Sequence, residues 1–279
     1  MRYLFFLVLP LYAQLLIGNN ILTYEQYLKL KHPLPYEYSM EHNQNYLFYF
    51  GSNHSRDPHD AQYQKLKVFW EDFLKKTQSQ NCIVLVEDRL RNLHNSLTTE
   101  QAIRGAGSVG GFITFLAQQN NIPVACPEPT NTLLFQKLLQ KYTVEQLAYT
   151  LFAQAVLEWH RIIKIRDDLP FHIHIQSHLE YIQKELTFQC DLEDMKAFHK
   201  QLFNSEFNEH DEMFFYSITN PTIQDTAINN LCRDRSILRG RVIVDNIKKL
   251  FLEQGKNIFI VFGATHAVMQ EPALRKMVL

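Results

Sequence analysis

Asn45-Tyr-Leu-Phe-Tyr-Phe-Gly-Ser-Asn-His54 and Asn257-Ile-Phe-Ile-Val-Phe-Gly-Ala-Thr-His266 are the stretches that decide the fold, because the second repeats the pattern of the first. Each is a short apolar run, rich in aromatic and β-branched residues, that stops at a glycine. This pattern is typical of a buried strand followed by a tight turn. Each stretch also places a histidine three residues after its glycine. Because ligands collect at the carboxyl ends of parallel strands, His54 and His266 are candidates for one shared site.

Two further apolar runs predict neighbouring strands. Cys82–Val86 is unbroken and apolar, as expected of a central parallel strand, and Ile122–Cys126 follows it along the chain. Between the strands, Asp60 is a plausible N-cap for a helix of about twenty residues, and Phe112–Gln119 predicts another helix. The alternation predicts an α/β fold with a central, mainly parallel sheet flanked by helices.

Two segments depart from this alternation. Thr23–Met40 contains Pro33 and Pro35, which favours a lead-in with a short helix over a sheet strand. From about residue 131 to 252 the apolar spacing is helical, which predicts a long helical insertion before the last strand. The predicted helices are Leu133–Leu139, Val144–Ile165, Leu179–Phe188, Leu192–Phe203 and Ile223–Leu252. We expect one domain over residues 21–279, with this insertion as a cap over the sheet.

Composition excludes some partners and leaves others open. The chain has 279 residues and a formal net charge of −1, so it lacks the excess of Lys and Arg that nucleic-acid binding requires. Its four cysteines form no C-x-x-C pair, and their wide spacing favours free thiols over a disulfide or a zinc site. They are Cys82, Cys126, Cys190 and Cys232.

The N-terminus resembles a secretory signal. Residues 1–20 contain a basic start, an apolar run and a candidate cleavage position after Ala13. The run is short for a spanning helix, which needs about 20 residues. The alternative is an apolar first helix of a cytoplasmic protein. A signal would imply a secreted or periplasmic protein, and any membrane contact would come through this segment if it stays uncleaved.

His54, His266 and Glu87 are candidate metal ligands. Neutral imidazole binds zinc, manganese, iron and cobalt, and a two-histidine site needs at least one carboxylate to hold a divalent ion firmly. Glu87 follows the strand Cys82–Val86 directly, so three strand ends can supply the set. The alternative is that both histidines are hydrogen-bonded loop residues.

Arg91 and Arg233 are candidate catalytic arginines. Arg91 follows Glu87 closely, and Arg233 lies in the Arg-Asp pair at the start of an amphipathic helix. A guanidinium there can clamp a carboxylate or stabilise an oxyanion. The alternative is a structural ion pair with Asp234 or Glu87.

Other motifs carry weaker signals. Gly105–Gly110 matches G-x-G-x-x-G, but a nucleotide site needs a strand before it, and the preceding residues are polar. In Phe171–His178, His172 and His174 would share one face of a strand. No carboxylate or cysteine accompanies them at useful spacing, so ordinary exposed histidines are favoured. Zincin, serine hydrolase and P-loop motifs are absent from the sequence.

Taken together, the two Gly-x-x-His motifs, the intervening glutamate and the Arg-Asp pair resemble the TIKI/TraB family. That family is related at superfamily level to erythromycin esterases and ChaN-like haem-uptake proteins, and its TIKI members are metal-dependent proteases that favour manganese or cobalt. The resemblance covers the chain from about residue 45 to its end. It implies that His54 and His266 are metal or catalytic positions, that Glu87 is the conserved acid, and that Arg91 and Arg233 are the family's arginines.

The expected function is therefore metal-dependent hydrolysis, with a peptide bond as the first candidate. His54 and His266 would hold manganese, cobalt or zinc, Glu87 would be a third ligand or a general base, and Arg233 or Arg91 would stabilise an oxyanion. Two alternatives stay open within the superfamily. One is a metal-independent, esterase-like hydrolase, and the other is a non-catalytic protein that binds haem or another small molecule.

Overall fold

The computed structural model describes residues 20–87, 98–105, 108–164 and 169–279. The candidate signal segment therefore lies outside the described residues, except for Asn20. In chain order the elements are α1 (Tyr24–Tyr27), β1 (Tyr36–His42), β2 (Asn45–Ser52), α2 (Ala61–Thr77), β3 (Cys82–Val86), α3 (Thr99–Gly105), α4 (Ser108–Gln119), β4 (Val124–Ala125), α5 (Asn131–Leu138), α6 (Val144–Ile163), α7 (Phe171–Leu186), α8 (Leu192–Phe203), α9 (Glu212–Thr219), α10 (Ala227–Lys248), the π-helical turn η2 (Lys249–Glu253), β5 (Asn257–Gly263) and α11 (Ala264–Lys276).

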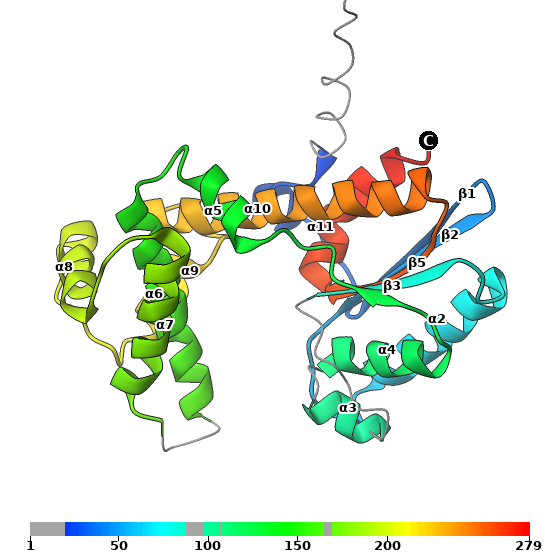
Figure 1. The fold of residues 1–279 in the computed structure, drawn as a ribbon, viewed down its shortest axis with the longest axis horizontal. Coiled ribbons are helices and arrows are strands. Elements are labelled where there is room, and N and C mark those ends of the chain that lie inside the picture. Colours follow the sequence, from blue (N-terminus) through cyan, green and yellow to red (C-terminus); the bar gives the residue numbers. More distant parts are fainter. Residues whose placement is uncertain (1–19, 88–97, 106–107, 165–168) are drawn as a thin grey trace, which may run out of the picture. The chain divides into compact units, whose positions relative to one another are not determined.

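The described strands form one five-stranded sheet in the order β1-β2-β5-β3-β4. β5 lies between β2 and β3 and is parallel to both, and β4 is parallel to β3. The last strand in sequence is thus the central strand of the sheet (Figure 1). This arrangement confirms the predicted α/β fold with a mainly parallel sheet and a helical insertion before the last strand.

The antiparallel edge strand β1 was not expected. Tyr36–His42 pairs with β2 from Tyr36 opposite Gly51 to His42 opposite Asn45, so the interpretation of Thr23–Met40 as a lead-in without a strand was wrong. The two prolines that suggested a loop precede the strand instead of interrupting it. Tyr38 and Met40 are buried, and the residues that alternate with them, Glu37, Ser39 and Glu41, are exposed. This alternation is the pattern of an edge strand with one covered face.

Helices bury both faces of the sheet. On one face, α2 and α4 pack over alternate residues of the central strands, and Phe48, Val84 and Phe259 are at the centre of that core. On the other face, the end of α10 and α11 cover the intervening residues, among them Tyr49 and Ile260. Burial of both faces explains why β2, β3 and β5 are nearly continuous apolar runs. Asp60 caps α2, as predicted, by accepting from the backbone N–H of Gln62.

The chain divides into two compact units. The first comprises residues 1–128 and 240–279 and contains the sheet, and the second comprises residues 129–239 and is helical. The second unit corresponds to the predicted insertion, although it ends within α10 and not near residue 252. Its core joins α5 to α10 around Tyr149, Phe152 and Phe215. α8 has the predicted bounds, whereas α9 was not predicted as a separate helix.

Two further expectations concern thiols and membranes. None of the four cysteines, all of which are described, forms a disulfide, as the spacing indicated. Burial raises the pKa of the Cys190 and Cys232 thiols to about 11, so both behave as small apolar residues and not as nucleophiles. Within the described ranges, no helix combines the length and the apolar character that crossing a bilayer requires.

Candidate functional site

His54 lies in the loop that follows β2. Its backbone is in the left-handed region, with φ at 60°, a conformation that histidine tolerates better than most residues. The loop before it is held by Gln62 of α2, whose side-chain oxygen accepts from the backbone N–H of Asn53 at 3.2 Å. Asn53 in turn accepts from the N–H of Ser55 at 2.9 Å. These bonds on both sides set the position from which the exposed His54 side chain extends.

His266 lies in the first turn of α11, which begins directly after β5. Gly263 is both the last residue of the strand and the N-cap of the helix. The imidazole of His266 packs edge-on against the ring of Phe262, with 5.9 Å between the centroids, and its side chain is 17% exposed. The two motif histidines therefore come from different local structures, one from a loop and one from a helix.

Glu87 is the residue immediately after β3. Its backbone N–H donates to Val261 at 3.2 Å, which extends the pairing of β3 with β5 by one step. Its side-chain Oε2 accepts from the backbone N–H of Gly263 at 2.9 Å. A carboxylate at this point also meets the positive end of the α11 dipole. Glu87 is thus fixed at the start of α11, one turn from His266.

The three side chains converge at the carboxyl edge of the sheet. Nε2 of His54 lies 3.9 Å from Oε2 of Glu87, and Nε2 of His266 lies 3.6 Å from Oε1. Each histidine therefore faces a different oxygen of the same carboxylate. Both distances exceed an ordinary hydrogen bond, yet two ligands at about 2.0–2.1 Å from one ion can be up to about 4.2 Å apart.

The two motif glycines make this convergence possible. A Cβ on Gly51 would lie 2.7 Å from the Cβ of Ala267 and 2.9 Å from the Cα of Ala264, so this glycine admits α11 against β2. A Cβ on Gly263 would collide with the imidazole of His54. The glycine of the second motif thus makes room for the histidine of the first. The two Gly-x-x-His motifs are interlocked parts of one structure.

The types of the three side chains suit a divalent transition metal, but their ligand atoms do not all lie within 4.8 Å of one another, so binding an ion would require the side chains to move closer together. Two imidazoles and one carboxylate are ligands that zinc, manganese and cobalt accept, and such a set leaves positions for water or substrate. The Glu87 carboxylate is oriented by the Gly263 N–H, in the way that ligating carboxylates are usually supported by a further hydrogen bond. The side chain of His54 is 61% exposed, so an ion could enter from solvent.

Of the two candidate arginines, only Arg233 belongs to the described residues. Arg91 lies outside the described residues. Arg233 is 9% exposed and belongs to the second unit, where its guanidinium donates to the carbonyls of Pro221 and Ile223 at 3.0 and 3.3 Å. These bonds position the chain before α10. The oxyanion role of both arginines stays a prediction.

Asp234, one of the alternative ion-pair partners proposed for the arginines, contacts two other side chains. Asp234 accepts from Lys141 at 2.6 Å and from the Tyr142 hydroxyl at 2.7 Å. This pairing raises the pKa of Lys141 through its hydrogen bond to the carboxylate.

Gly105–Gly110 lies between two helices and not after a strand. Gly105 ends α3, residues 106 and 107 lie outside the described ranges, and Gly110 is inside α4. The strand-to-helix turn that a dinucleotide site needs is therefore missing at this position. A Cβ on Gly110 would be 3.9 Å from the Glu87 carbonyl, which places the beginning of α4 next to the end of β3.

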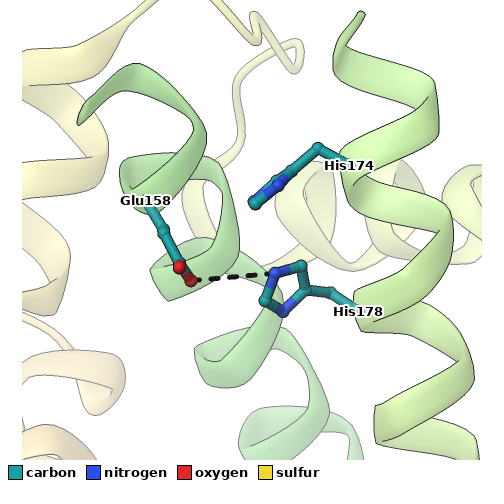
Figure 2. Close-up of side chains that lie close together, drawn as sticks. All are labelled: Glu158, His174 and His178. Carbon is teal, nitrogen blue, oxygen red and sulfur yellow. Dashed lines mark ion pairs between the residues drawn. The ribbon is translucent and has the colours of Figure 1, made fainter. Parts of the chain in front are cut away.

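The histidines of Phe171–His178 correct another expectation. The segment is the first half of α7, so His172 and His174 do not share a strand face. His172 is exposed, but His174 is 8% exposed and His178 is half-buried. Figure 2 shows that His174 and His178 extend toward Glu158 of α6. The carboxylate that the sequence did not show beside these histidines is thus supplied by another helix. The sequence signal that could have indicated this cluster is the spacing of four residues between His174 and His178, which places both on one face of a helix.

No family model matches this chain, and no curated protein or solved structure is significantly similar to it. Its resemblance to the TIKI/TraB family therefore stays a prediction from short motifs. Any functional conclusion depends on the geometry of the described residues.

Proposed function

We propose that the protein is a metal-dependent hydrolase whose site is formed by His54, Glu87 and His266. The observation that carries the proposal is the position of the Glu87 carboxylate, with one oxygen facing each imidazole at the ends of three adjacent strands. Along the chain, Glu87 comes 33 residues after His54, and His266 comes 179 residues after Glu87. Their convergence supports a common role, because the two histidines come from different local structures and still face the same carboxylate.

Each residue has a distinct task in this proposal. His54 and His266 would bind the ion through neutral imidazole nitrogens, and Glu87 would complete the set or accept the proton of the attacking water. A bound divalent ion would polarise the scissile carbonyl and lower the pKa of a water molecule to about 7. The exposed His54 side chain marks the side from which substrate would enter. A peptide is the first substrate to test, on the basis of the family resemblance alone.

The test combines metal binding with hydrolysis. Purified protein is stripped with a chelator, reloaded with manganese, cobalt or zinc, and incubated with a peptide library whose cleavage products are detected by mass spectrometry. We expect metal-dependent cleavage that Glu87→Gln and His266→Ala abolish. His59→Ala is the matched control, since His59 is an exposed histidine in the same loop region as His54. A protein that binds none of these ions and cleaves no peptide or simple ester would refute the proposal.

The same preparation separates the alternatives. Cleavage of an ester that survives complete metal removal would indicate the metal-independent hydrolase. A Soret band after haem addition that is lost in His54→Ala, without any hydrolysis, would indicate the binding protein. Either result would replace the present proposal, because neither alternative needs a resident divalent ion.

A further inference from the structure

A second histidine–carboxylate cluster lies in the helical unit. His174 and His178 are four residues apart on α7, so both side chains extend from one face of that helix. Glu158 extends toward them from α6, which packs against α7 (Figure 2). One ligand atom from each of the three residues lies within 4.8 Å of the other two. The proposed hydrolysis uses none of these residues.

His174 is oriented by a backbone carbonyl. Its Nε2 lies 3.1 Å from the carbonyl oxygen of Ala155, and since a carbonyl can only accept, the ring proton is on Nε2 and the lone pair is on Nδ1. Histidines that bind metals usually donate their other N–H to a carbonyl or carboxylate in this way. Ala155 is three residues before Glu158, so α6 supplies both the orienting carbonyl and the carboxylate.

His178 completes the cluster at a distance close to that between ligands of a shared ion. Its Nε2 is 3.7 Å from Oε2 of Glu158, which is too long for a hydrogen bond and slightly longer than the separation of about 3.4 Å between two ligands of a tetrahedral zinc ion. The two imidazole centroids are 4.5 Å apart.

We propose that Glu158, His174 and His178 form a Zn²⁺ site that links α6 to α7. Two imidazoles with one carboxylate suit zinc, whereas magnesium and calcium prefer sets made of oxygen alone. The buried His174 provides a fixed ligand, and the Glu158 side chain, which is 55% exposed, can adjust its rotamer to close the last part of the distance. Its exposure also gives the ion a route from solvent. The site joins two helices of the helical core.

The experiment uses full-length protein that carries His54→Ala and His266→Ala, which removes the first candidate site. Zn²⁺ is titrated into this metal-free variant by isothermal calorimetry in the presence of a reducing agent. We expect one Zn²⁺ per chain and a rise in Tm of roughly 5 °C at saturating metal. Adding His178→Ala or Glu158→Gln should weaken binding at least about tenfold and reduce the rise in Tm.

His172→Ala on the same background is the matched control, because His172 lies on α7 two residues before His174 but is exposed. It should bind Zn²⁺ like its parent. Circular dichroism checks that each variant is folded, and Glu158→Gln, at an exposed position, decides the case if His178→Ala unfolds. No saturable Zn²⁺ binding up to about 100 μM, or binding that Glu158→Gln leaves unchanged, would overturn the proposal.

This result is independent of the proposed function. The background variant lacks two of the three residues of the first site, so zinc bound to it cannot report on that site. Conversely, failure of the helical site would leave the hydrolysis experiment unaffected.

Discussion

The two histidine–carboxylate clusters of this chain are assembled in opposite ways. His54, Glu87 and His266 come from distant parts of the sequence, and the register of three neighbouring strands brings them together. Glu158, His174 and His178 come within 21 residues of one another and are aligned by helical spacing on α6 and α7. The first cluster depends on the whole sheet, and the second depends on one helix pair.

This difference determines what each cluster needs from its surroundings. At the strand ends, two glycines are required so that α11 and the His54 imidazole can fit beside β2 and β5. On the helices, a single carbonyl, that of Ala155, orients the buried histidine. A site at strand ends is therefore sensitive to backbone substitutions, whereas the helical site is sensitive mainly to its own side chains.

The largest expected difference between the clusters is in hydrolysis. Glu87→Gln should lower kcat/KM by at least about 100-fold, because it removes the carboxylate that would ligate or accept a proton. His178→Ala should leave kcat/KM unchanged. Steady-state kinetics on the cleaved peptide or ester measure both. Equal losses in the two variants would mean that the clusters are not separate in function.

A pair of glycine substitutions tests how the first cluster is built. Gly51→Ala should lower the free energy of unfolding by about 1–3 kcal/mol, because the new methyl group would overlap Ala267 and the backbone of Ala264. In Gly263→Ala, the three atoms nearest to the new methyl group all belong to the exposed ring of His54. This substitution should change stability by less than about 0.5 kcal/mol but weaken metal binding about tenfold or more.

Gly110→Ala is the control for this pair, since its nearest contact would be 3.9 Å away. Urea unfolding and metal titration provide the two readouts. If Gly51→Ala is as stable as the unmodified protein, the tight packing of α11 on β2 is not as described.

The smallest expected difference concerns the two carboxylates in metal-free protein. Glu87→Ala should cost about 1 kcal/mol, because the Gly263 N–H at the start of α11 loses its acceptor. Glu158→Ala should cost less than about 0.5 kcal/mol, since its ion pair with His178 is long and solvent-exposed. Thermal or urea unfolding with a chelator present compares the two. A larger loss for Glu158→Ala would contradict the view that this carboxylate serves only the ion.

Much of the sheet could be predicted because its strands are short and buried on both faces. The run Cys82–Val86 matches β3 residue for residue, and the Asn257 stretch begins where β5 begins. β1 was missed because only alternate residues are buried and two prolines precede it. β1 is a strand because it pairs with β2, and nothing in the sequence of Tyr36–His42 itself indicates this partner.

The candidate sites show the same limits. His54 and His266 could be chosen from the sequence because their motifs are repeated, and Glu87 because it follows a strand. The contact between Gly263 and the His54 ring could not be predicted, since it depends on how β5 lies beside β2. The helical cluster was missed because the histidines of Phe171–His178 were compared with a strand face and a carboxylate was sought only near them in sequence, whereas Glu158 comes from another helix.

The central claim is that His54, Glu87 and His266 hold one metal ion. A crystal grown with zinc, with data collected on both sides of the zinc absorption edge, tests it most directly. The account predicts an anomalous peak within about 2.3 Å of ligand atoms from all three residues, and its loss in His266→Ala crystals. A well-ordered site without a peak, or a peak that contacts none of the three side chains, would contradict it.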